Sequence, residues 1–209
     1  MTATDLFVDF LCPYAWRGVE LAAVLRAQGE SFRLRHFSLV QGNHPDNAGQ
    51  PEPQWWLTDQ AAGDGAPHQQ SSLAAFLAAR AAAQQGEEAT WAFTLALFRA
   101  RHEAGQPLDE AAISGAAQAA GLDLARWQAA RADDAALRAS LRQDLADAHQ
   151  IGVFGTPTYV LPDGHAAYYR FDHLTRDPEV ARERWNLYLS VLRSEAGIGT
   201  IKRAKPPKR

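Results

Sequence analysis

The sequence predicts an α/β fold that is interrupted by an all-helical insertion. A strand, a helix and a second strand follow one another at the start of the chain, and two strands and a helix close it. Between these parts lies a long alanine-rich stretch with apolar residues at helical spacing. A strand, helix and strand in succession form a parallel pair with a right-handed crossover. We therefore expect one α/β unit that the helical block divides in sequence.

The first part of the α/β unit begins with the apolar, β-prone run 6–10, which predicts a short buried strand. Apolar positions then recur at helical spacing from residue 14 to 28, and Gly29 ends the pattern. Apolar and basic residues alternate over 31–39, which predicts the second strand. Residues 41–67 are rich in glycine, proline, asparagine and glutamine, and we expect them to form a long irregular loop.

The middle block, residues 71–150, is expected to be helical throughout because alanine favours helix intrinsically. One helix is predicted over 87–103. Asp109 and Asp123 are placed to cap the two helices that follow, since a carboxylate at the N-cap accepts from free backbone N–H groups. A last helix is predicted over 134–149.

The α/β pattern resumes after this block. Residues 158–161 predict a strand, 162–164 a turn and 167–171 the antiparallel partner strand. Residues 178–195 carry apolar side chains at helical spacing and predict the final helix.

This order predicts four parts. Residues 1–70 form the first part of the α/β domain, residues 71–150 the helical insertion and residues 151–201 the second part of the α/β domain. Residues 202–209 form a basic tail that we expect to be disordered.

Composition narrows the classes of function. Hydrophobic residues make up 46% of the chain and charged residues 22%, as in ordinary globular proteins. The net charge of −3 gives no reason to expect nucleic acid or a membrane surface as partner. The sequence shows neither a signal peptide nor an apolar stretch of about 18 residues. One cysteine cannot form an internal disulfide, so we expect a cytoplasmic protein, although an exported protein without its signal would look similar.

The only cysteine, Cys12, stands where the first strand turns into the first helix, with Pro13 at the first helical position. A sulfur at a helix N-terminus faces unpaired N–H groups and the positive end of the helix dipole, and both favour the thiolate form. A thiolate is a nucleophile, so the sequence predicts a reactive centre at Cys12. The alternative is a small buried apolar residue, which is how lone cysteines commonly behave.

Two segments resemble the signatures of the DsbA family, whose thioredoxin-like fold is interrupted by a helical insertion. Residues 9–16, DFLCPYAW, resemble the active-site sequence in which Cys-Pro-x-Cys opens the first helix. Residues 152–160, GVFGTPTYV, resemble the loop whose cis proline faces the active-site sulfur. The branches that the chain resembles most are the FrnE-like proteins, the kappa-class glutathione transferases and the 2-hydroxychromene-2-carboxylate isomerases.

The resemblance implies a DsbA-like thiol–disulfide oxidoreductase with Cys12 as the nucleophile. Ala15 stands where dithiol members have their second cysteine, so a mixed disulfide cannot be released by internal attack. We therefore expect a monothiol reaction in which glutathione or another thiol resolves the intermediate. The kappa-class transferases and the isomerases carry serine at the position of Cys12 and activate glutathione, so a glutathione-dependent transferase or isomerase is the alternative. A non-catalytic binding module is a third hypothesis.

The resemblance also implies a groove for a peptide or for glutathione beside Cys12. If the Thr156–Pro157 bond is cis, the Thr156 backbone can pair with an extended thiol peptide. Residues expected to line this groove are Pro13, Tyr14, Trp16, Thr156 and Pro157. For Trp16, packing in the core is the alternative to a role in the groove.

Two weaker matches concern glutathione itself. The segment around Asp172 resembles the region where the glutathione-using relatives present an aspartate to the ligand's amino group, and Asn43 lies in a segment that resembles a loop near their glutathione pocket. A solvated surface carboxylate is the alternative for Asp172. We expect no tightly bound cofactor, glutathione as co-substrate and a thiol or disulfide as partner. The scattered histidines predict no metal site, and the sequence leaves a monomer and a homodimer open.

Overall fold

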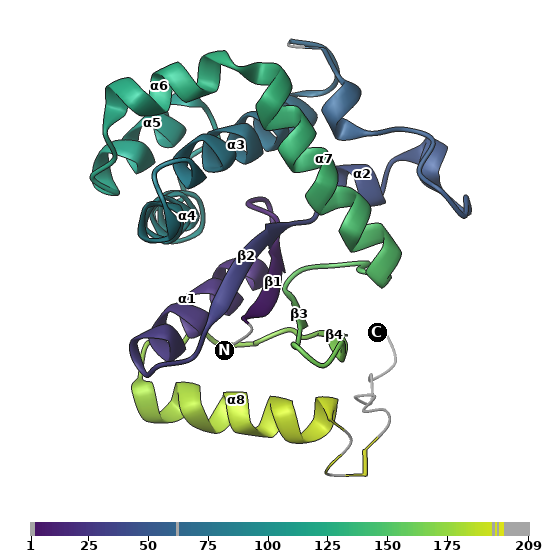
Figure 1. Cartoon of the computed structure of the whole chain (residues 1–209), viewed down its shortest axis with the longest axis vertical. Coiled ribbons are helices and arrows are strands. Elements are labelled where there is room, and N and C mark those ends of the chain that lie inside the picture. Colours follow the sequence, from purple (N-terminus) through teal and green to yellow (C-terminus); the bar gives the residue numbers. More distant parts are fainter. Residues whose placement is uncertain (1–2, 62, 194, 196, 199–209) are drawn as a thin grey trace, which may run out of the picture.

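The fold is built on a mixed sheet whose strand order is β2-β1-β3-β4. The computed structural model describes residues 3–61, 63–193, 195 and 197–198. Figure 1 shows the sheet between a helical block and one long helix. The strands are β1 Thr4–Val8, β2 Phe32–His36, β3 Thr158–Val160 and β4 Ala166–Tyr168.

The first part of the sheet is a strand, helix and strand, as the sequence predicts. β1 and β2 pair in parallel with Leu6 opposite Leu34, and helix α1, Pro13–Ala27, joins them. β3 then pairs antiparallel with β1, which places Tyr159 opposite Leu6. The parallel crossover and the antiparallel third and fourth strands are therefore confirmed.

The two faces of the sheet are covered by different helices. On one face, Tyr159 packs against Trp185 of helix α8, Pro178–Leu192, and its hydroxyl donates to the carbonyl of Gly18 in α1. On the other face, Phe7 packs with Ala148 near the end of helix α7. Because both faces are covered, the residues at the centre of β1 are fully buried.

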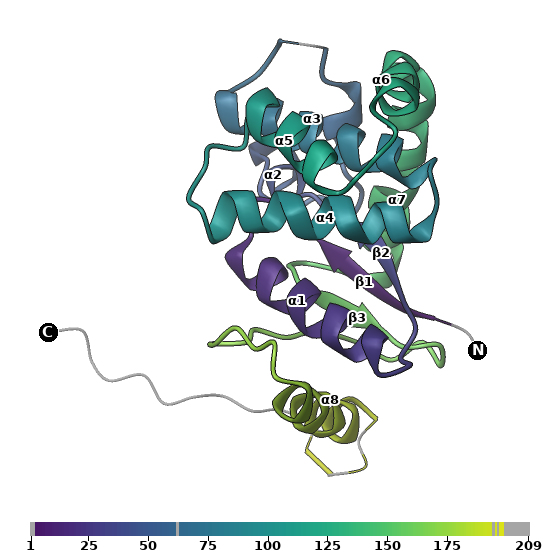
Figure 2. The ribbon, with the colours of Figure 1, turned by 90° about the vertical axis from the view of Figure 1, so that its left-hand side faces the viewer.

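The helical block lies between β2 and β3 in sequence and above the sheet in Figure 2. Asp109 and Asp123 accept from backbone N–H groups as N-caps, as predicted. The last helix of the block returns to the sheet and leads into β3. The helices are α3 Pro67–Ala83, α4 Glu87–His102, α5 Glu110–Ala119, α6 Leu124–Ala132 and α7 Asp134–Ile151.

The segment between β2 and α3 is more ordered than an irregular loop. It contains helix α2 Leu39–Gly42 and the short 3₁₀ helices η1 Pro45–Asn47 and η2 Leu57–Asp59. Asn47 accepts from the Trp55 N–H and donates to the Trp55 carbonyl, which ties the segment to itself. Most of the described residues of this segment lie outside helices and strands, as expected, but side-chain to backbone bonds and short helices fix their course.

Several element ends differ from the predicted ones. β1 begins earlier and ends at Val8, α8 ends at Leu192, and β4 ends at Tyr168. The predicted basic tail, residues 202–209, lies outside the described residues, and the four-part division of the chain stays a prediction. In the described part of the chain, no helix combines the length and apolar character that crossing a bilayer requires.

Candidate active site

Cys12 is the N-cap of α1, at the end of the turn that follows β1. Its backbone is extended, with φ −94° and ψ 115°, and Pro13 occupies the first turn of the helix. The Cys12 N–H donates to the Asp9 carbonyl at 3.0 Å, and the Trp16 N–H donates to the Cys12 carbonyl at 3.2 Å. The sulfur thus lies at a helix N-terminus, where the backbone N–H groups of the first turn have no helical acceptor.

The sulfur meets the second signature segment. The Cys12 thiol donates to the Thr156 carbonyl, with 3.2 Å between Sγ and the oxygen, and the Thr156–Pro157 bond is cis. Cys12 as a whole is 7% exposed, while the neighbouring Pro13 is exposed and Tyr14 half-buried. The thiol therefore lies just beneath the surface, and the fold brings together Cys12 and Thr156 as expected.

Gly18 sets the distance between α1 and the Pro157 loop. A Cβ built at Gly18 would lie 2.8 Å from Pro157 Cβ and 3.1 Å from the Tyr159 hydroxyl, which is too close for either atom. The helix and the loop can pack this tightly only because residue 18 has no side chain. Sequence reasoning missed this residue, although a glycine inside a helical pattern is a signal of close backbone approach.

Asp9 holds the turn that carries Cys12, and sequence reasoning also missed it. Its fully buried carboxylate accepts from the Leu11 N–H at 2.8 Å and from the Leu39 N–H at 2.7 Å. Burial raises the pKa of Asp9 to about 6, although both backbone hydrogen bonds act to lower it. The side chain joins the active-site turn to the start of α2. A lone acid inside an apolar strand pattern is the signal that could have found it.

Aromatic and basic side chains surround the approach to Cys12. The guanidinium carbons of Arg170 and Arg17 lie 4.5 Å and 5.3 Å from the centroid of the Tyr14 ring. Arg170 Nε also donates to the Tyr168 hydroxyl. We call these four residues, Tyr14, Arg17, Tyr168 and Arg170, the cationic mouth. Beside it, the Phe154 ring is 75% exposed and packs on Tyr168 at 5.4 Å between centroids.

Trp16 is turned toward the helical block. Its Nε1 donates to Glu20 at 3.3 Å, and its ring stacks on His102 at 6.0 Å between centroids. His102 Nε2 in turn lies 2.8 Å from the Phe10 carbonyl, and burial lowers the pKa of this histidine. These contacts favour the packing role for Trp16 over a role in the groove.

Asn43 and Asp172 lie in different places around the site. Asn43 Nδ2 donates to the Leu39 carbonyl, and the residue lines a cavity of about 420 Å³ together with Leu11, the neighbour of Cys12. Asp172 is exposed and follows Phe171, whose carbonyl accepts from Arg17 Nη1 at 2.9 Å. The glutathione contacts predicted for Asn43 and Asp172 stay predictions.

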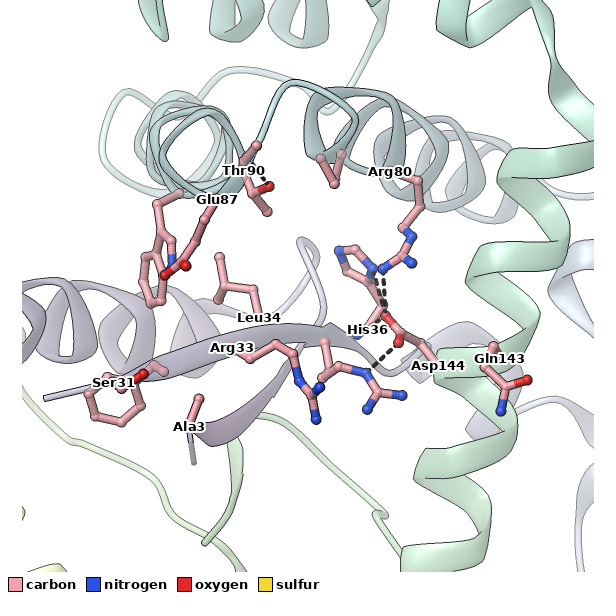
Figure 3. Close-up of a pocket in the computed structure, with 16 residues that line it drawn as sticks. Ala3, Ser31, Arg33, Leu34, His36, Arg80, Glu87, Thr90, Gln143 and Asp144 are labelled. Atoms are coloured by element: carbon pink, nitrogen blue, oxygen red, sulfur yellow. Dashed lines mark hydrogen bonds and ion pairs between the residues drawn. The ribbon is translucent and has the colours of Figure 1, made fainter. Parts of the chain in front are cut away.

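A second cavity, of about 600 Å³, lies along the outer edge of β2 and is lined by charged side chains. Figure 3 shows His36 and Arg80 turned toward Asp144. His36 Nδ1 lies 3.3 Å from Asp144 Oδ2, and Arg80 Nη1 lies 3.0 Å from the same oxygen. Although burial opposes it, hydrogen bonding and these cations lower the pKa of Asp144 to about 2. Arg35 and Arg80 both pair with Asp144, and the residues that line this cavity include no cysteine.

No cluster of three or more histidine, cysteine, aspartate or glutamate side chains is arranged to hold a metal ion within the ranges that the structure describes.

Comparison with known protein families shows to which family the chain belongs. The model of the DSBA-like thioredoxin domain matches residues 3–176. The chain belongs to this family. The predicted DsbA-family resemblance and thioredoxin-like fold are thus confirmed. No curated protein sequence matches the chain.

Solved DsbA-like structures agree with this fold. The cytosolic disulfide reductase DsbM from Pseudomonas aeruginosa is 20% identical, with a TM-score of 0.57 over 91% of this chain and 100% of that chain. The same reductase solved with GSH is 20% identical, with a TM-score of 0.59 over 90% and 99%. A 2-hydroxychromene-2-carboxylate isomerase is 14% identical, with a TM-score of 0.59 over 95% and 100%.

Proposed function

We propose that this DSBA-like protein is a monothiol thiol–disulfide oxidoreductase in which Cys12 is the nucleophile. The observation that carries the proposal is the position of the one cysteine. Cys12 is the N-cap of α1, and its sulfur is 3.2 Å from the Thr156 carbonyl of the opposite loop. A structural cysteine would need neither the helix N-terminus nor the meeting of these two segments.

The first step is attack on a disulfide. Cys12 gives its proton to solvent, and the thiolate attacks one sulfur of a substrate R–S–S–R′. A new S–S bond forms between Cys12 and R–S, the old S–S bond breaks, and R′–S⁻ leaves and takes up a proton. The attacking sulfur stands at the N-terminal end of α1, where the helix dipole is positive.

The substrate docks beside the same loop. In the free protein the Thr156 carbonyl accepts from the Cys12 thiol. Once the thiol has lost its proton it no longer donates, so this carbonyl is left to accept an N–H from an extended peptide or from glutathione. The Thr156 carbonyl therefore lies where it can accept from the substrate backbone beside Cys12.

The second step needs a thiol from outside. Ala15, where a resolving cysteine would stand, is fully buried and has no thiol. A glutathione thiolate attacks the mixed disulfide, releases Cys12 and forms R–S–S–G. The balance is R–S–S–R′ plus G–SH giving R–S–S–G plus R′–SH, so no other oxidant or reductant is required. The similar fold of the reductase DsbM, which is cytosolic and was solved with GSH, supports glutathione as co-substrate and a reducing cytoplasm as the location.

The test is exchange between reduced glutathione and a mixed disulfide of glutathione with a small thiol. This exchange releases the small thiol and forms glutathione disulfide, which glutathione reductase and NADPH detect. We expect Cys12→Ser to lose at least about 100-fold in kcat/KM, because a hydroxyl is a poor nucleophile at neutral pH. Urea unfolding checks that the variant is folded. Retained glutathione-dependent activity in Cys12→Ser would contradict the proposal and favour a transferase or isomerase. A wild-type protein that binds peptide without turning over any disulfide would favour a binding module.

A further inference from the structure

The cationic mouth carries two arginines over one aromatic ring. Tyr14 follows Cys12 by two residues in the first turn of α1, and Arg17 follows Tyr14 by one turn of the same helix. Arg170 reaches the Tyr14 ring from the end of the β4 segment, at 4.5 Å from its centroid. Two guanidinium groups from distant parts of the chain thus flank the ring of Tyr14, which lies in the same helical turn as the nucleophile.

Both arginines are held in place by uncharged acceptors. Arg170 Nε donates to the Tyr168 hydroxyl, and the Tyr168 ring centroid is 5.5 Å from the guanidinium carbon. Arg17 Nη1 donates to the Phe171 carbonyl at 2.9 Å. These bonds fix the direction of each guanidinium without neutralising its charge.

Arg170 is close enough to the nucleophile to interact with its charge. The hydrogen bond with Tyr168 does most to raise the pKa of Arg170, burial acts against it, and electrostatic interactions with Tyr168, Tyr14 and Cys12 add to the rise. The same electrostatic field reaches a substrate whose sulfur is bonded to Cys12.

The two arginines of the cationic mouth differ from the arginines that bind Glu20 in the middle of α1. Among the residues that the structure describes, no ion pair joins Arg17 or Arg170 to an acidic side chain. By contrast, Arg99 and Arg176 both bind the carboxylate of Glu20. Arg170 is also exposed, so its positive charge faces solvent beside the approach to Cys12.

We propose that Arg170, supported by Arg17, makes the site select disulfides and thiols that carry a carboxylate close to the sulfur. This inference rests on the proposed function. A carboxylate near the reacting sulfur binds the exposed guanidinium while the sulfur reaches Cys12, whereas a substrate ammonium group is repelled. Charges of this kind act mainly on association, and they are screened by salt.

The experiment uses three small disulfides that differ in charge: dithiodiglycolate, which is anionic, hydroxyethyl disulfide, which is neutral, and cystamine, which is cationic. The rate of mixed-disulfide formation on Cys12 is measured by intact-mass spectrometry for wild type, Arg170→Gln and Arg170→Lys. Arg126→Gln is the matched control, because Arg126 is an exposed arginine on α6 in the helical block. Dividing each variant's rate by the wild-type rate cancels the intrinsic reactivity of each disulfide.

We expect Arg170→Gln to slow the anionic disulfide about tenfold, to leave the neutral one within about twofold and to speed the cationic one a few-fold. Arg170→Lys keeps most of the preference, Arg126→Gln behaves as wild type, and about 0.5 M salt narrows the wild-type differences.

Two results would overturn the inference. If Arg170→Gln changes all three rates by one common factor, or changes none, Arg170 does not select by charge, while the proposed function stands. If folded wild-type protein reacts with none of the three disulfides, the proposed function fails and the inference fails with it.

Discussion

Helix α1 carries charged side chains at two places, and they are held in opposite ways. In its middle, the Glu20 carboxylate has a side chain only 1% exposed and accepts from Arg99 at 2.7 Å and from Arg176 at 2.7 Å. At its N-terminal end, Arg17 and Arg170 flank Tyr14 and bond to uncharged oxygens. The charges of the first group pair with each other, whereas those of the second group lie beside the approach to Cys12.

The charged group in the middle of α1 contributes to stability, whereas the charged group at its N-terminal end lies beside the proposed nucleophile. A buried carboxylate with two guanidinium partners joins α1, α4 and the segment before α8, and these partners lower the pKa of Glu20 to about 2 although burial opposes them. Asp9 is a contrasting case beside Cys12: it is buried without a cation, and its pKa is raised to about 6. The paired charge of Glu20 therefore ties elements together, while Asp9, Arg17 and Arg170 near the thiol form no ion pair within the described part of the chain.

Removing Glu20 should have the largest effect on stability. We expect Glu20→Gln to lower the free energy of unfolding by about 3 kcal/mol, because it removes charged hydrogen bonds and leaves the two arginines facing each other. Urea unfolding at pH 7 measures this. The matched control is Glu103→Gln, which removes the exposed partner of Arg176 and should change the free energy of unfolding far less than Glu20→Gln does.

The pH dependence of the Glu20 effect follows from its lowered pKa. The ionised form is favoured by folding, so its contribution is present above about pH 4.5 and is lost as pH falls through about 2. A loss of less than 1 kcal/mol in Glu20→Gln would contradict the view that this cluster holds the elements together.

Asp9 should show the opposite pH dependence with a smaller effect. Its pKa is raised from 3.8 to about 6, so its stabilising contribution is complete below about pH 3.8 and is lost as pH rises through about 6. Asp9→Asn should cost about 1–2 kcal/mol at pH 5, since an amide cannot accept both backbone N–H groups through two oxygens.

The measurement for Asp9 is urea unfolding at pH 4.5 and pH 7 for both proteins. The deficit of Asp9→Asn relative to wild type should shrink toward pH 7, where wild type must hold a buried negative charge. A deficit that grows with pH would mean that the ionised carboxylate is the stabilising form, and the contrast with Glu20 would then be wrong.

The sequence predicts the parts of the site that are local. Cys12 at the start of a helix and the loop at Thr156 are both visible as short segments, and the structure brings them to 3.2 Å. The strand, helix and strand order also predicts the parallel pair correctly. These features follow from hydrophobic periodicity and turn chemistry, which act over a few residues.

The features that sequence reasoning missed depend on contacts between distant segments. Asp9 bonds to the N–H of Leu39, Gly18 packs on Pro157, and Arg170 reaches Tyr14 from the far end of the chain. The partner of each residue lies far away along the chain, so a local pattern can mark the residue but does not show which contact it makes. Trp16 is predicted to line the groove, with core packing as the alternative, and its ring stacks on His102 because α4 lies against α1.

The most direct test of the central claim asks whether Cys12 reacts faster in the folded protein than in the unfolded chain. Wild-type protein, either native or unfolded in urea, is incubated with glutathione disulfide at pH 7. The reaction is quenched with acid, and the mass of the protein is measured by intact-mass spectrometry. We predict one glutathione per chain, formed faster on the folded protein and removed by reduced glutathione. A folded protein that stays unmodified while the unfolded chain reacts would show that Cys12 is a packed core residue and would contradict the proposal.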